Sequence, residues 1–241
     1  MIYKIYPLLV FLLLSFGKDS KNTADVKSAT TKTIAKVEKN LTVDAKIESI
    51  YNTLNPNNFT LPELKSFTEA MKGFYLLKEK GLIQKNILTL VDFSLSSNTK
   101  RLWVIDMTTN TILFNSLVAH GRNTGEEFAS AFSNINSSFK SSLGFYATGE
   151  IYQGKHGASL RLDGLERGLN DNARERGVVM HGADYVSDSF IRDHKRLGRS
   201  QGCPALPVEL TDEIIETIKN KSCLYIYHPS RSFAMEEKLI S

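Results

Sequence analysis

Short segments that favour β-strands run through the chain from residue 86 to residue 228, and they limit what it can fold into. Ile87 to Phe93 places β-branched or aromatic residues at every second position, as a half-buried strand does. Segments 102–106 and 111–119 flank four turn-forming residues and indicate a hairpin. Four further segments have a strand-forming composition: 144–148, 159–162, 178–180 and 222–228. This series predicts a mainly β domain.

Apolar residues at helical spacing occur before this series and near its end. Segment 41–81 has two such stretches, and Thr60 with Glu63 forms the pattern of a capping box at the start of the second. Pro207 to Lys219 has the same periodicity and predicts an amphipathic helix. We therefore expect a short helical segment over 41–81, followed by a mainly β domain with few helices over 86–230.

The first 40 residues differ in composition from the rest of the chain. Lys4 precedes the uncharged, mostly apolar residues 5–17, which is the pattern of a secretory signal peptide. A bilayer span needs about 20 apolar residues. We therefore expect residues 1–17 to be a signal peptide, and the chain to be exported to the periplasm or cell envelope. An uncleaved anchor is the alternative, because no A-x-A cleavage site is present. Residues 18–40 are polar, lack aromatic residues and predict a flexible linker.

Bulk composition narrows the classes of function. The 241 residues are 41% hydrophobic, which is enough for one substantial domain. The net charge is only +4, and no cluster of Lys and Arg interleaves with aromatic residues, which argues against nucleic-acid binding. Two cysteines exclude a disulfide framework. The composition indicates no integral membrane partner and leaves the oligomeric state open.

The segment from Gly177 to Pro207 contains the residues with the greatest catalytic potential. An apolar run leads to His181, and Cys203 follows 22 positions later, directly after Gly202. An imidazole can take the proton of a thiol, and the thiolate can then attack a carbonyl carbon. Backbone N–H groups in a glycine-containing turn can bind the oxyanion that forms. This pattern predicts cysteine-dependent acyl-transfer chemistry.

Cys203 is the predicted nucleophile because its sequence neighbours are polar, basic and turn-forming, unlike those of a structural cysteine. Arg196, Arg199 and a protonated His181 would each lower the pKa of its thiol. Cys223 lies in an apolar strand segment, where we expect it to pack in the core. A disulfide between the two cysteines is the alternative, and it would abolish thiol chemistry.

Three His-Gly pairs compete for the role of base. Only His181 follows an apolar, β-branched run that would hold it rigidly, so we expect it to be the base. His120 is the second choice, or it lines the substrate cleft. His156 is interpreted as a loop histidine, and His194 as part of a solvated, charged face.

We expect neither a metal nor another cofactor. His181, His194 and Cys203 could ligate a metal, but their spacings match no zinc pattern. Arg199 lies four residues before Cys203, and its guanidinium could bind a substrate carboxylate in bidentate geometry.

With these residues, the chain resembles the murein L,D-transpeptidase catalytic domains of the YkuD-like fold. Their signature is His-Gly, a spacer, and then Ser/Thr-His-Gly-Cys. His181-Gly182 and Ser200-Gln201-Gly202-Cys203 correspond to it, and the similar region spans roughly 86–228. The resemblance implies a mainly β, sandwich-like domain with segment 41–81 outside its usual core.

The resemblance also implies roles for single residues. His181 would be the base, oriented through the backbone carbonyl of Gly182, and the N–H groups of Gly202 and Cys203 would form the oxyanion hole. Ser200 matches the hydroxyl residue of the signature.

The chain departs from that signature at three points. Gln201 stands in place of a second histidine, Pro204-Ala205 stands in place of a residue followed by Arg or Asn, and the spacer is longer. The replaced groups assist substrate binding in the common form. Gln201 is therefore a candidate for substrate binding, together with Arg199 and His120.

The chemistry that the resemblance implies acts on peptidoglycan stem peptides. Cys203 would attack the peptide bond after the third residue of a tetrapeptide stem, release D-Ala and form a thioester. An amine of a neighbouring stem would then resolve the thioester. With water as the acceptor, the same site would make an L,D-carboxypeptidase or a cross-link hydrolase. A non-catalytic cell-wall-binding module is the remaining alternative.

Overall fold

The computed structural model describes residues 42–231. The expected signal peptide, 1–17, and linker, 18–40, lie outside the described residues. Over the described range, no helix has both the length and the apolar character needed to cross a membrane. The helices are α2 (Val43–Asn52), α3 (Leu64–Glu79), α4 (Asp188–His194) and α5 (Val208–Ile218). The strands are β1 (Ile87–Asp92), β2 (Leu102–Asp106), β3 (Thr111–Ser116), β4 (Gly144–Gly154), β5 (Gly157–Gly164), β6 (Val179–Gly182), β7 (Ala205–Leu206) and β8 (Cys223–Tyr227).

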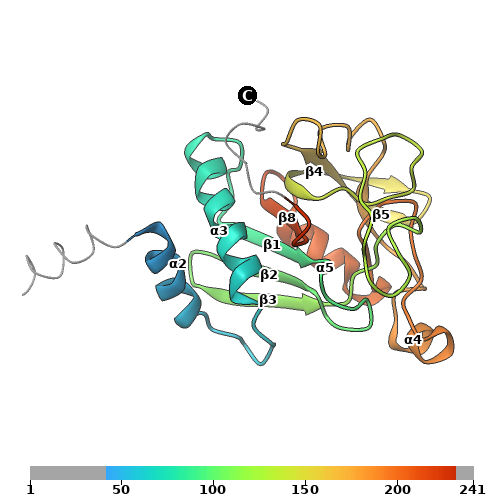
Figure 1. Cartoon of the computed structure of the whole chain (residues 1–241), viewed down its shortest axis with the longest axis horizontal. Coiled ribbons are helices and arrows are strands. Elements are labelled where there is room, and N and C mark those ends of the chain that lie inside the picture. Colours follow the sequence, from blue (N-terminus) through green and yellow to red (C-terminus); the bar gives the residue numbers. More distant parts are fainter. Residues whose placement is uncertain (1–41, 232–241) are drawn as a thin grey trace, which may run out of the picture. The chain divides into compact units, whose positions relative to one another are not determined.

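These strands form one sheet in the order β3-β2-β1-β8-β4-β5-β6-β7 (Figure 1). β1 pairs with β8 and β6 pairs with β7 in parallel, and the other pairs are antiparallel. Beyond β3, Ala119 bridges to Ala205 of β7, and Gly121 bridges to Ser200. The two edges of the sheet therefore meet and give it a barrel-like form. We call the contact between residues 119–121 and 200–205 the closing seam.

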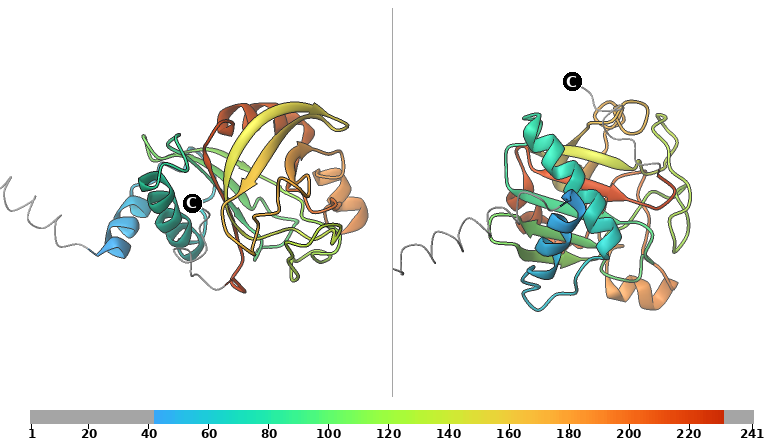
Figure 2. Two further views of the ribbon diagram at one scale, coloured as in Figure 1. Left: turned by 90° about the horizontal axis from the view of Figure 1, so that it is seen from above. Right: turned by 60° about the vertical axis from the view of Figure 1, so that its left-hand side comes forward.

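β1, β2 and β8 bury both of their faces, because alternate side chains enter two different cores. Leu88, Leu90 and Trp103 point into the first core, which the helices α2 and α3 cover. Leu102 and Val104 point into the second core, which Ile214, Ile215 and Ile218 of α5 complete. Figure 2 shows α2 and α3 side by side on one side of the sheet. The alternation of side chains along these strands thus determines which face packs against α2 and α3 and which face packs against α5.

Helix α3 forms and docks for local reasons. Phe67, Met71, Phe74 and Leu77 lie on one face at helical spacing, and all four are buried. Gly73 is necessary where the helix approaches the sheet, since a Cβ there would lie 2.0 Å from the ring of Phe145.

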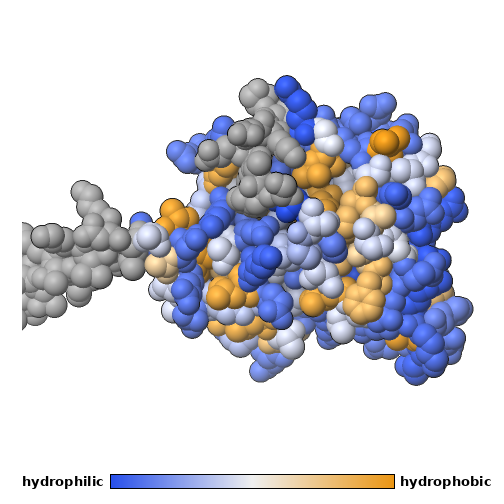
Figure 3. Space-filling view, in the orientation of Figure 1, coloured by the Kyte–Doolittle hydropathy of each residue, from blue (hydrophilic) through white to orange (hydrophobic). Residues whose placement is uncertain are grey.

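The face of the molecule in Figure 3 is largely hydrophilic, with hydrophobic side chains in separate patches.

The expected mainly β fold with few helices is confirmed. The capping box is wrong: α3 begins at Leu64 after Glu63, and no side chain caps it. The Thr60 hydroxyl instead donates a hydrogen bond to Asn115 Oδ1 at 3.1 Å. The short elements α4 and β7 were not expected, because seven and two residues are too few to show a hydrophobic period.

Candidate active site

His181 lies near the end of β6, between two neighbouring strands. It is opposite Ser159 of β5 and Ala205 of β7. Its Nδ1–H donates a hydrogen bond to the Gly182 carbonyl oxygen at 2.9 Å, the contact that the resemblance implies. This bond fixes the tautomer in which Nε2 carries no proton and can accept one.

Burial lowers the pKa of His181, and the positive charges of His156 and Lys155 lower it further. A lowered pKa keeps the imidazole neutral near pH 7, which is the form a general base needs.

The turn that carries Cys203 is held by its own residues and by the closing seam. The Ser200 hydroxyl donates to the Cys203 carbonyl oxygen at 2.6 Å and accepts the Gly202 N–H at 3.0 Å. On the other side, the Ser200 N–H donates to the His120 carbonyl oxygen at 3.0 Å. Gly202 has a φ of +124°, and a Cβ there would lie 2.9 Å from the Lys140 carbonyl oxygen, so only glycine fits.

The Cys203 thiol is partly buried and contacts the start of β6. Its Sγ accepts the Val179 N–H at 3.4 Å and lies 3.8 Å from the Gly177 carbonyl oxygen. Burial raises the pKa of the thiol, while the Val179 N–H and the charges of Arg176 and Lys155 act in the opposite direction. A thiol whose pKa is raised in this way needs a nearby base to become a nucleophile.

Cys203 and His181 open into the same pocket, which has a volume of about 400 Å³. Three other residues singled out from the sequence also line it: Arg199, Ser200 and Gln201. Lys155, His156, Arg176 and Tyr185 contribute further walls. Among the described residues that line this pocket there is no Asp or Glu, so its charge is positive.

The Gly202 N–H is already engaged, which changes the expected oxyanion hole. It donates to the Ser200 hydroxyl. The Cys203 N–H, by contrast, donates to no acceptor within residues 42–231. Of the two donors that the resemblance implies, the structure leaves that of Cys203 available.

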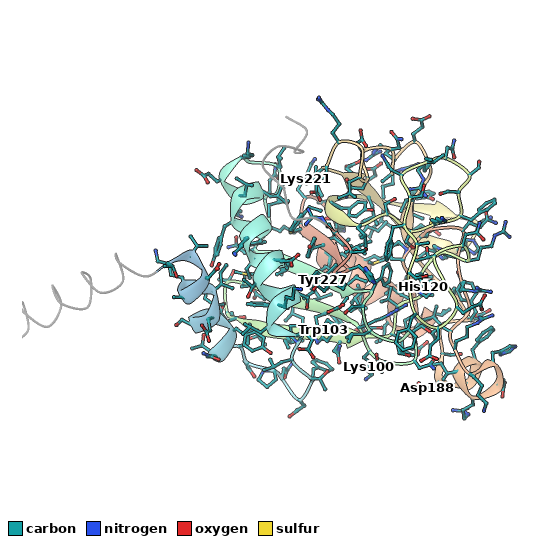
Figure 4. The ribbon with its side chains drawn as sticks, viewed as in Figure 1. Lys100, Trp103, His120, Asp188, Lys221 and Tyr227 are labelled. Carbon is teal, nitrogen blue, oxygen red and sulfur yellow. The ribbon has the colours of Figure 1, made fainter. Side chains whose placement is uncertain are left out.

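His120 lies outside the pocket, in the interior of the half that carries β5 and α4 (Figure 4). Its side chain is buried, and both ring nitrogens are occupied. Arg101 Nη2 donates to Nδ1 at 2.8 Å, and Nε2–H donates to the Gly125 carbonyl oxygen at 3.2 Å. Its burial and the Arg101 charge lower the pKa of His120 to about 4. The expectation that His120 lines the substrate cleft does not fit this position.

The basic residues before Cys203 are bound to the protein. Arg199 Nη1 contacts Glu126 at 2.6 Å and the Gly125 carbonyl oxygen at 3.0 Å. Arg196, which does not line the pocket, pairs with the same Glu126 at 2.9 Å. The cations that act on the thiol are instead Arg176 and Lys155.

Both cysteines are free thiols, so the alternative disulfide is not formed. Cys223 is fully buried in β8, and burial raises the pKa of its thiol. His194 stacks on Phe190 of its own helix with ring centroids 4.0 Å apart. Over residues 42–231 no group of three or more His, Cys, Asp or Glu side chains is arranged to hold a metal ion.

Three basic pocket residues were not expected there from the sequence: Lys155, His156 and Arg176. The first two form the connection between β4 and β5, and the Gly154-x-x-Gly157 spacing indicates such a turn. Their proximity to His181 depends on the register of β5 against β6, which composition does not specify. Arg176 is held by the Ser133 and Lys140 carbonyl oxygens at 2.8 and 2.7 Å, in a segment without regular structure.

The family model of the L,D-transpeptidase catalytic domain, YkuD_2, matches residues 60–227. The chain belongs to this family. The YkuD-like fold expected from the sequence is thereby confirmed. The match includes α3, whereas the resemblance was expected to begin near residue 86. Among curated proteins, no sequence matches significantly.

Several solved structures are similar to the chain. An L,D-transpeptidase from Mycobacterium smegmatis is 11% identical, with a TM-score of 0.38 and 59% of each chain covered. The helical cell shape determining protein Pgp2 from Campylobacter jejuni is 15% identical, with a TM-score of 0.39, 66% of this chain and 56% of that chain covered. An L,D-transpeptidase from Stackebrandtia nassauensis is 12% identical, with a TM-score of 0.36 and 69% of each chain covered. The chain thus spans less than two thirds of the first two neighbours.

Proposed function

We propose that this chain is a peptidoglycan-modifying cysteine L,D-transpeptidase, with Cys203 as nucleophile and His181 as base. The observation that supports this most is the tautomer of His181. Its Nδ1–H is bound to the Gly182 carbonyl oxygen, and its ring opens into the pocket that Cys203 also lines. Membership of the L,D-transpeptidase catalytic domain family supports the reaction class.

The first half-reaction forms a thioester. His181 Nε2 takes the thiol proton, and Sγ attacks the carbonyl carbon between the third residue of a stem peptide and its terminal D-Ala. The oxyanion that forms accepts the Cys203 N–H, which has no protein acceptor in the described residues. The intermediate then breaks the C–N bond, and the imidazolium returns the proton to the departing D-Ala amine.

The second half-reaction passes the acyl group to an amine of a neighbouring stem. The amine attacks the thioester carbon, its proton moves to His181, and the cysteine leaves as the thiolate and is reprotonated. The product is a cross-link between the third residues of two stems. With water as acceptor, the same steps release a tripeptide, because acceptor choice depends on which nucleophile reaches the thioester.

The charge of the pocket supports an anionic stem peptide as the ligand. Lys155 has no hydrogen-bond or ion-pair partner within the described residues, and no carboxylate lines the pocket. Arg176 has only neutral partners there, whereas Arg199 is paired with Glu126. Lys155 and Arg176 therefore offer uncompensated charge to the carboxylates of a stem peptide. Gln201 stays a candidate for substrate binding at the pocket wall.

Action on peptidoglycan requires that the chain reach the cell wall. We propose that residues 1–17 direct export and that residues 18–40 tether the catalytic domain. Both segments lie outside the described residues, and their composition supports these roles. Fractionation of cells, with immunodetection of the full chain and N-terminal sequencing, tests export and cleavage.

Incubation with a disaccharide-tetrapeptide, followed by mass spectrometry, tests the function. Wild type is expected to give a dimer that has lost one D-Ala, and Cys203→Ala is expected to give no product. Tripeptide without dimer would assign hydrolysis in place of transfer. If neither protein changes the substrate, and if Cys203 reacts with a small electrophile no faster than the buried Cys223, a non-catalytic cell-wall-binding module is the better assignment.

A further inference from the structure

The connection between β4 and β5 places a second histidine beside the proposed base. Gly154 pairs with Gly157, so Lys155 and His156 form the end of this hairpin, and we call residues 154–157 the hairpin tip. Gly157 has a φ of +81°, which glycine adopts readily, and none of the other tip residues has a positive φ. A left-handed glycine that follows a turn is a common way to close a hairpin.

The register of the sheet carries the tip to His181. Ser159 of β5 is opposite His181 of β6, so His156 lies only three residues from the paired position. The rings of His156 and His181 stack with centroids 4.6 Å apart and planes 18° from parallel. Both rings line the same pocket as Cys203.

We propose that His156 is a positioning residue for His181: its ring lies flat against the imidazole and holds the plane that presents Nε2 to the thiol. This inference rests on the proposed function of His181 as base. The hydrogen bond from Nδ1 to Gly182 fixes one point of the ring but leaves it free to tilt about that bond. Contact over one face removes this freedom, and an oriented base transfers a proton faster than a tilting one.

The stacked ring also brings charge near the base. Charged or titratable groups line the pocket around His181 on all sides. Tyr152 comes from β4, Lys155 and His156 from the tip, Arg176 from the segment before β6, Tyr185 from the segment after it, and Arg199 and Cys203 from the turn that carries the thiol. A positive charge on His156 disfavours the protonated form of His181. Replacement of His156 by a neutral ring should therefore raise the pKa of the base while it preserves the stacking.

Three variants of the full chain separate orientation from fold. His156→Phe keeps a flat ring, His156→Ala removes it, and His194→Ala removes a stacked histidine that does not line the pocket. For each, the rate of iodoacetamide alkylation at Cys203 is followed by peptide mass spectrometry over about pH 5 to 9, where histidine titrates. Turnover of the disaccharide-tetrapeptide gives kcat and KM.

We expect His156→Ala to lose activity and thiol reactivity, and His156→Phe to retain both because it keeps a flat ring. His156→Ala should lower both the alkylation rate near neutral pH and kcat about tenfold with little change in KM. His156→Phe should stay within about twofold of wild type at the plateau and shift the acidic limb of its pH profile upward. His194→Ala should match wild type in both measurements.

Failure of the inference and failure of the proposed function give different results. If His181→Ala slows alkylation and turnover but His156→Ala does not, the positioning role is overturned and the base assignment stands. If His156→Phe is as impaired as His156→Ala, and its pH profile does not move, stacking is not what the base requires and the proposal is overturned. If His181→Ala changes neither rate, both assignments fall.

Discussion

His181 and His120 are both buried histidines followed by glycine, yet the structure uses their ring nitrogens differently. His181 commits only Nδ1, to the Gly182 carbonyl oxygen. His120 commits both nitrogens, one to Arg101 and one to the Gly125 carbonyl oxygen. A base needs a nitrogen that is free to accept a proton, and only His181 has one that opens into the pocket.

The two histidines also hold different parts of the protein together. His120 lies between Arg101, which is fully buried, and a loop that contacts Arg199. Its backbone carbonyl accepts the Ser200 N–H. The His120 side chain therefore supports the closing seam, while the His181 ring opens into the pocket that Cys203 also lines. Similar sequence contexts can thus give one histidine with both ring nitrogens engaged and another with one nitrogen left free.

The largest expected effect is on turnover in His181→Ala. Loss of the base should lower kcat by about 10³-fold, because general base catalysis contributes in this range. Thermal unfolding should change little, since only the bond to Gly182 and the stacking on His156 are lost. Steady-state assays of His181→Ala and His120→Ala side by side check the comparison, and the reverse ranking would assign the role of base to His120.

Acid destabilisation should come next in size, and it should depend on His120. The pKa of His120 is about 4 in the folded chain, below the usual value of 6.5, so the unfolded chain binds more protons between these values. Stability is then present above about pH 6.5 and falls by roughly 2–3 kcal/mol as the pH drops to about 4. The lowered pKa of His181 acts in the same direction.

Urea unfolding of wild type and His120→Asn at several pH values measures this loss. The variant should show a shallower decline of the free energy of unfolding through the same window. An identical decline in both proteins would assign the acid sensitivity to other groups.

His120→Ala should mainly affect stability. It leaves the buried guanidinium of Arg101 without one acceptor, which costs about 2 kcal/mol. Because His120 does not line the pocket, kcat per folded molecule should fall less than about tenfold. Calorimetry together with active-site titration separates the two quantities. A loss of kcat with unchanged stability would give His120 a part in the chemistry.

The smallest expected effect on stability belongs to Ser200→Ala. The hydroxyl bridges Gly202 and Cys203, and its loss should cost about 1 kcal/mol of stability and about tenfold in kcat. Ser187→Ala is a matched control, because it removes a hydroxyl with similar backbone bonds at the start of α4. The control should lose similar stability and no activity, and equal losses of activity in both would remove the special role of Ser200.

The sequence predicted the elements that contain enough residues for their hydrophobic periodicity to be recognised. β1, β2 and α5 were expected within one or two residues of their bounds because their apolar positions repeat regularly. Thr60 was misassigned as a cap because a local pattern cannot reveal that its hydroxyl binds Asn115, 55 residues away.

Part of the composition of the pocket was expected from the sequence, whereas the catalytic roles of its residues stay a prediction. Cys203 and His181 carry functional groups that sequence context identifies, and both line one pocket. His156 and Arg176 were not expected, since their position depends on strand register and on carbonyl oxygens of irregular loops. The position of His120 could not be predicted for the same reason, because only the folded chain brings Arg101 and Gly125 to its ring nitrogens.

The closing seam links the reactivity of the Cys203 thiol to the folding of the whole domain. Ala119 and Ala205 exchange two backbone hydrogen bonds, and 85 residues of chain lie between them. We therefore expect the turn that carries Cys203 to become ordered late in folding, because a contact between residues so far apart in the sequence closes slowly. In a partly folded chain, the Cys203 thiol should react slowly. During refolding, hydrogen exchange should show that the Ala119 and Ala205 amides become protected at the same time as the reactivity of Cys203 rises. We therefore expect the reactivity of the Cys203 thiol to report on completed folding.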